Sequence, residues 1–188
     1  MLTLAIALFA GPVAHAQTAP DLQAKLQPFQ VQTQSYVLPS GLRIIMQEDD
    51  AVPLVTVSTV VGAGRMHDPK GKGDLAHMVE HLSYQAEVGD YPAASWLESS
   101  GTKYDAQTQV ERTLFVSAAP AEALGMLLAI EGQRALDPLA GVTEADLEAQ
   151  KDVMDLEQNY HTADAYWAGV PALIQGLFPE DHAWAGAM

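Results

Sequence analysis

A five-residue segment, His77-Met78-Val79-Glu80-His81, constrains this chain more than any other. It lies in a run, 73–87, whose apolar residues predict a helix, because at about 100° per residue they form a single stripe. The residues of that stripe are Leu75, Met78, Val79 and Leu82. His77, Glu80 and His81 fall within an arc of about 100° on the opposite side. We therefore expect a helix that packs through one face and presents two imidazoles and one carboxylate on the other.

The spacing of these three polar residues is typical of a zinc site. Two histidines at i and i+4 can reach one ion, and neutral imidazole is a good zinc ligand. A glutamate between them can reach a water molecule that the metal activates. The alternative is a solvated helix face that happens to carry three polar groups. A chain of this composition would contain His-x-x-Glu-His by chance roughly 0.01 times, which favours the metal site.

The order of the residues adds information, since His-x-x-Glu-His inverts the commoner zinc motif and marks the inverzincins. With the preceding Gly73-Asp74-Leu75-Ala76, the segment resembles the Gly-Leu-Ala-His-x-x-Glu-His motif of the pitrilysin, insulysin and mitochondrial-processing-peptidase family. That family takes its third zinc ligand from a glutamate on a later helix, and the segment 153–157, ending in Glu157, resembles that step. Asp74 falls near the helix start, where a carboxylate is favoured.

The resemblance implies a zinc metallopeptidase that hydrolyses peptide bonds of unfolded peptides. It implies a Zn²⁺ ion held by His77, His81 and Glu157, with Glu80 as the base that takes a proton from water. The family usually has a second acidic residue two helical turns before its glutamate ligand, and Gln150 stands there. The alternative function is a non-catalytic or partner-dependent family subunit that acts as a binding or assembly module.

The rest of the pattern predicts an α+β fold, an antiparallel sheet with helices packed on one face. The resemblance implies that this fold is one half of a pitrilysin-type peptidase. Strand-like runs occupy 36–38, 42–47, 54–61, 103–108 and 112–119, and helical runs occupy 92–100, 121–135 and 144–160. The run 103–108 resembles the family strand on which substrate docks, with Asp105 where the family prefers Asn. Without the resemblance, it is simply one strand of a hairpin.

Charge and composition limit the partners. The net charge of −15 argues against nucleic acid, which needs a basic footprint, and against an anionic membrane surface. It mildly favours cationic substrates, although acidic surfaces more often serve solubility. The resemblance implies a peptide substrate and a second peptidase half or related partner chain, because active family members close two such halves around the peptide.

The N-terminus reads as a targeting segment. An apolar run, 2–10, too short to span a bilayer, is followed by Ala14-His15-Ala16, a small-x-small cleavage site. No cation precedes the run, and a buried N-terminal strand is the alternative. We expect a signal peptide over 1–16, a loosely ordered Gln-rich leader over 17–34 and a truncated N-terminal zinc-peptidase domain over 35–188. Export to the periplasm or secretion follows from the signal peptide, without a membrane span.

Overall fold

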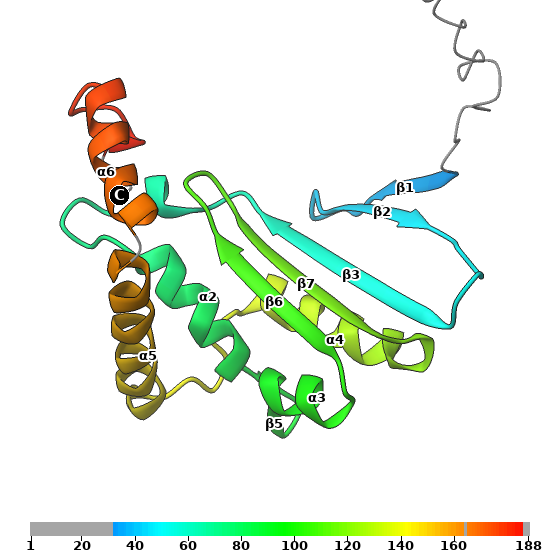
Figure 1. The fold of residues 1–188 in the computed structure, drawn as a ribbon. Helices are drawn as coiled ribbons and strands as arrows, with labels where there is room; N and C mark the ends of the chain where they lie inside the picture. Colours follow the sequence, from blue (N-terminus) through cyan, green and yellow to red (C-terminus); the bar gives the residue numbers. More distant parts are fainter. Residues whose placement is uncertain (1–31, 164, 186–188) are drawn as a thin grey trace, which may run out of the picture. The chain divides into compact units, whose positions relative to one another are not determined.

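The computed structural model describes residues 32–163 and 165–185. The expected signal peptide, 1–16, and the leader up to residue 31 lie outside the described residues. The chain divides after Ala51 into two compact units. The first holds an antiparallel hairpin of β1 (Thr33–Val37) and β2 (Arg43–Gln47), with Thr33 opposite Gln47 (Figure 1). Strand β1 begins inside the range expected to be leader.

The second unit is built on a three-stranded antiparallel sheet with the order β3-β7-β6. Its strands are β3 (Leu54–Val61), β6 (Lys103–Thr108) and β7 (Thr113–Pro120). In the central strand every second residue is buried, namely Thr113, Phe115, Ser117 and Ala119. Alternate side chains of a strand point to opposite faces, so this period of two marks one covered face.

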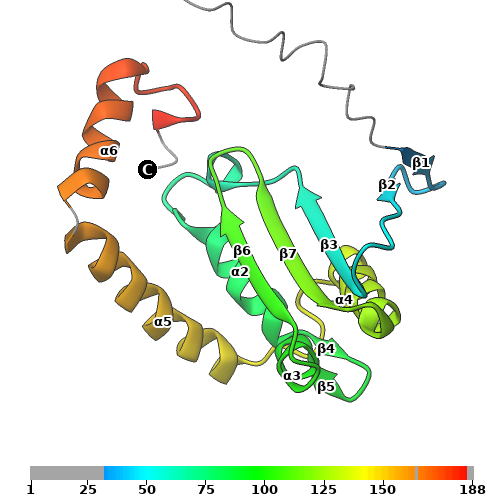
Figure 2. The same cartoon turned by 45° about the vertical axis from the view of Figure 1, so that its right-hand side comes forward.

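Helices cover that face of β7. The Phe115 ring lies 5.9 Å from the Tyr84 ring of α2 (Leu75–Gln85) and 3.8 Å from the Arg134 guanidinium of α4 (Leu124–Leu136). Both helices therefore pack on the same side of the sheet, as Figure 2 shows. This confirms the expected α+β class. The cluster of buried core residues includes Leu127 and Ile130 of α4 and Ala119 of β7, and it is completed by Ala93 and Leu97.

The remaining elements of the second unit are short, except for two helices near the end of the chain. They are η1 (Arg65–His67), β4 (Glu87–Val88), β5 (Tyr91–Pro92), α3 (Ala93–Ser99), η2 (Ala121–Ala123), α5 (Glu144–Ala163) and α6 (Ala165–Leu177). Helix α5 begins with a reciprocal cap, in which the Thr143 amide donates to Asp146 and the Asp146 amide donates to Thr143 Oγ1. Among the described residues, no helix has the length and apolar character of a membrane span.

The buried residues of α2 differ from those expected for a helix with one apolar face and one polar face. Leu82 is buried as expected, whereas Leu75 is 41% exposed and Glu80 is only 7% exposed. The reason is that α2 contacts the sheet, α3 and α5 rather than a single layer. Its buried residues therefore include Glu80 and Ser83 as well as Leu82, and the Glu80 carboxylate does not belong to a solvated face.

Candidate metal centre

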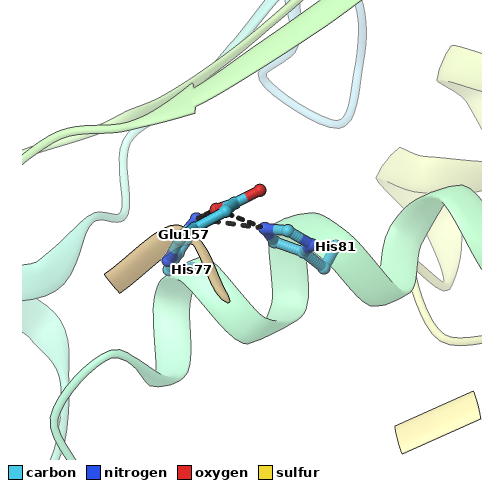
Figure 3. A group of neighbouring side chains, drawn as sticks. All are labelled: His77, His81 and Glu157. Atoms are coloured by element: carbon cyan, nitrogen blue, oxygen red, sulfur yellow. Dashed lines mark hydrogen bonds and ion pairs between the residues drawn. The ribbon is translucent and has the colours of Figure 1, made fainter. Parts of the chain in front are cut away.

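Two helices that are far apart in the sequence bring three of the predicted site residues together. Helix α2 supplies His77 and His81, and α5, which packs beside it, supplies Glu157 (Figure 3). The two Nε2 atoms lie 3.1 Å apart, and each lies 3.5 Å from Glu157 Oε2. The imidazole side chains are 16% and 13% exposed and the Glu157 side chain is 43% exposed, so the cluster opens to solvent on the α5 side.

The hydrogen bonds on the far side of each ring fix which nitrogen faces the cluster. His77 Nδ1 lies 3.1 Å from Asp74 Oδ2, and His81 Nδ1 lies 3.1 Å from Gln150 Oε1. Carboxylate and amide oxygens only accept, so both Nδ1 atoms carry the hydrogen. In the neutral rings Nε2 then presents a lone pair. Two nitrogen lone pairs and a carboxylate oxygen therefore converge, and their mutual repulsion is relieved when a metal ion or a proton lies among them.

These three donor atoms fit zinc. Tetrahedral bonds of about 2.0–2.1 Å place neighbouring ligand atoms about 3.3 Å apart, and the distances observed here are 3.1 and 3.5 Å. Two imidazoles and one carboxylate form a donor set that catalytic zinc sites use, with the fourth position left for water or substrate. A structural site would fill all four positions with protein ligands.

Ionisation around His77 is coupled to two neighbours. Burial by itself would raise the pKa of Asp74. Hydrogen bonds from His77 and Arg65 have the larger combined effect and lower the pKa of Asp74 to about 2. The hydrogen bond to the Asp74 carboxylate in turn raises the pKa of His77, against the opposing effect of burial. Arg65 Nε donates to Asp74 Oδ1 at 2.8 Å, so Asp74 is held as a carboxylate between a guanidinium and a ligand histidine.

Glu80 lies on the same helix but not among the three converging groups. Its Oε2 accepts a hydrogen bond of 2.5 Å from Thr108 Oγ1 at the end of β6. Thr108 is also 3.2 Å from the Thr113 hydroxyl, which donates to Ala63 O. Thr108 and Thr113 are 7% and 6% exposed. The candidate base is thus held by the buried Thr108 hydroxyl at the end of β6, with the buried Thr113 hydroxyl beside it.

Sequence reasoning placed Asp74 at the start of the helix but missed what it does. It is the N-cap residue, yet its φ is +67° and its side chain makes no cap hydrogen bond. Asp68 caps the helix instead, because its carboxylate oxygens accept from the Leu75 and Ala76 amides at 3.1 and 2.8 Å. No local sequence signal pointed to Asp68, which lies in the loop before the helix.

The contact between Arg65 and Asp74 was also missed, because loop packing sets it. A Cβ on Gly64 would lie 2.3 Å from Gln109 O, so glycine allows the loop to approach the β6–β7 turn. There the Arg65 amide donates to Gln109 O at 3.0 Å. The Gly62-Ala63-Gly64 run marked backbone freedom in the sequence, but it did not indicate the partner.

Comparison with known proteins shows the family to which the chain belongs. The family profile of insulinase, peptidase family M16, matches residues 43–174. The chain is 34% identical over 152 residues to "Coenzyme PQQ synthesis protein F" of Pseudomonas aeruginosa. The matched region covers 78% of this chain and 19% of that protein.

A solved structure shares the fold. It is described as the crystal structure of a protease from Helicobacter pylori, with a TM-score of 0.56 and 17% identity over 71% of this chain and 32% of that one. The chain therefore spans about a fifth of the Pseudomonas relative and about a third of the Helicobacter structure. With the profile match over most of its length, the chain belongs to the insulinase family of peptidases, M16.

Proposed function

We propose that this chain is the metal-binding part of a zinc metallopeptidase that hydrolyses peptide bonds of unfolded peptides. The observation that carries the proposal is the convergence of His77 Nε2, His81 Nε2 and Glu157 Oε2 within 4.8 Å of one another. Family membership supports a peptidase-like function, and the three donor atoms support zinc as the metal. Bound zinc would polarise the scissile carbonyl and lower the pKa of the attacking water.

The remaining roles in the proposed reaction belong to protein side chains. His77, His81 and Glu157 hold the metal. Glu80 takes the proton of the attacking water and passes it to the leaving amine. Thr108 donates to Glu80 Oε2, which leaves Oε1 as the oxygen without this hydrogen bond. The Thr108 bond also holds the carboxylate in one orientation before substrate arrives, which lowers the cost of ordering it during the reaction.

The peptide is proposed to dock along β6. In the described part of the chain, β6 is the last strand of its sheet and pairs only with β7. An extended peptide can add to such an edge through main-chain hydrogen bonds, which tolerate many sequences. Thr108 at the end of this strand bonds Glu80, so a peptide paired with β6 would run towards the base. Asp105, which is exposed on β6, would lie beside the peptide.

We further propose that a second peptidase half completes the active site, either in the same polypeptide or in a partner chain. The chain spans 19% of its Pseudomonas relative and 32% of the Helicobacter protease chain, so both of these proteins contain much more than this unit. The second half would close over the peptide and provide further contacts to it.

The test compares the parent protein with Glu80→Gln, each alone and with the second half present. Zinc content and hydrolysis of an internally quenched, unstructured peptide are measured. We expect about one zinc per chain in both proteins and loss of hydrolysis by at least about 100-fold in the variant, the lower range for a lost general base. Glu98→Gln, on α3, is the matched control and should keep both properties. Parent-like hydrolysis by Glu80→Gln would refute the assignment of the base.

The alternative, a non-catalytic binding or assembly subunit, gives a different result in the same experiment. It is favoured by one contact, since His81 is bonded to the neutral Gln150 amide, where a carboxylate would support the ligand more strongly. A parent protein that binds zinc but cleaves no peptide, even with the second half, would establish this alternative.

A further inference from the structure

Asp74 adopts a backbone conformation that its side chain does not favour. Its φ is +67°, and in the described part of the chain it is the one non-glycine residue with a positive φ. Left-handed conformations are costly for residues with a Cβ, although Asp and Asn tolerate them better than most. Strain of this kind persists where the surrounding structure enforces it, and it is found at functional sites. The position therefore needs a reason to hold aspartate rather than glycine.

The usual reason, helix capping, does not apply. Asp68 already accepts from the first two amides of α2, and Asp74 makes no side-chain cap bond. Instead, one Asp74 oxygen accepts from Arg65 at 2.8 Å and the other from His77 Nδ1 at 3.1 Å. Arg65 is itself fixed, since its Nη1 donates to Thr108 O at 3.0 Å. The carboxylate is thus held by the sheet and aimed at one imidazole.

The two imidazoles of the cluster have unequal partners. His77 is bonded to the Asp74 carboxylate and His81 to the neutral Gln150 amide. Either partner fixes the tautomer and orients the ring of a ligand histidine, but a carboxylate raises the basicity of the ligating nitrogen more than a neutral amide does. The two contacts have the same length, 3.1 Å, so the difference between them is charge.

We propose that Asp74 is a positioning residue for the metal, which orients and polarises His77, and that metal affinity depends more on Asp74 than on Gln150. This inference rests on the proposed function, because it presupposes that His77 binds metal. Asp74 itself does not touch the ion. It acts through His77, and the strained backbone at the helix start is retained because only an acidic residue provides this support.

The test is zinc affinity, measured by competition with a chromogenic chelator, together with urea unfolding of the metal-free proteins. We expect Asp74→Asn and Asp74→Gly to weaken zinc binding about 10- to 100-fold, the range found when such partners of ligand histidines are removed. Gln150→Ala should weaken zinc binding less than either. Asp68→Ala is the matched control, since it removes the cap of the same helix without touching His77; it should lower the urea midpoint and leave zinc affinity of the folded protein within about threefold.

The outcomes are distinguishable. If the parent binds no zinc, the proposed function fails and this inference with it. If the parent binds zinc and both Asp74 variants bind it equally well, only this inference is overturned. A loss of zinc affinity in Asp68→Ala as large as that in Asp74→Asn would also overturn this inference, because the loss would then come from a weakened helix start. A larger loss in Gln150→Ala than in Asp74→Asn would reverse the proposed ranking.

Discussion

Replacement of Thr108 by valine tests whether the buried Glu80 carboxylate depends on its hydroxyl partner. Both residues are 7% exposed, and the bond between them is 2.5 Å. Valine keeps the shape of threonine and removes the donor, leaving a buried carboxylate oxygen without a partner. Hydrogen bonds to charged groups contribute roughly 1.5–3 kcal/mol, and we expect a loss of that size in the free energy of unfolding.

Urea unfolding of the metal-free protein measures this loss. With a denaturant slope of about 2 kcal/mol per molar, the urea midpoint should fall by about 1 M while the slope is unchanged. Thr108→Ser, which keeps the hydroxyl, is the control and should lose much less. In a Glu80→Met background there is no carboxylate to satisfy, so Thr108→Val should cost close to nothing. An equal cost in the two backgrounds would refute the reasoning, since it would show that the loss does not come from the bond to Glu80.

Three further predictions follow from the site and the core. Gln150→Glu places a carboxylate behind His81 and should tighten zinc binding by several-fold, up to about 10-fold, in chelator competition. Because Asp74 raises the pKa of His77 above its usual 6.5, zinc affinity should begin to fall near neutral pH as the solution is acidified. In the metal-free protein the sign is opposite: the stability from the pair of Asp74 and His77 is complete between the ordinary pKa values of the two groups, 3.8 and 6.5, and is lost as the pH rises through the raised pKa of His77. A pH series of urea midpoints would show this loss. Leu127→Ala removes a side chain that is 1% exposed and should lower the free energy of unfolding by about 2–5 kcal/mol.

Local pattern was sufficient for much of the fold and for two of the three ligand candidates, His77 and His81. Strand-like runs of residues, together with the family resemblance at 103–108, predicted β3, β6 and β7 to within one residue at each end. The spacing of His77 and His81 on one helix face requires only helix geometry. Glu157 was found through family resemblance, because nothing in α5 alone separates it from other acidic residues of that helix.

What the sequence did not indicate depends on packing between distant segments. Glu80 was expected beside the two histidines, on the face opposite the apolar stripe, but α2 is surrounded by the sheet, α3 and α5, and the carboxylate is buried against Thr108. Asp68 replaced Asp74 as the helix cap because Asp74 lies in the left-handed region and bonds Arg65 and His77 instead. The Arg65 contact with Asp74 depends on a loop conformation that Gly64 permits through close backbone contact, and periodicity carries no information about such contacts.

The most direct test of the account is the position of bound zinc, located by anomalous diffraction at the zinc absorption edge in crystals grown with the metal. We predict one strong peak about 2.0–2.2 Å from His77 Nε2, His81 Nε2 and a Glu157 carboxylate oxygen. A peak bound through Nδ1 of either histidine, or one that leaves Glu157 out of coordinating reach, would contradict the central claim that two distant helices form a single metal centre.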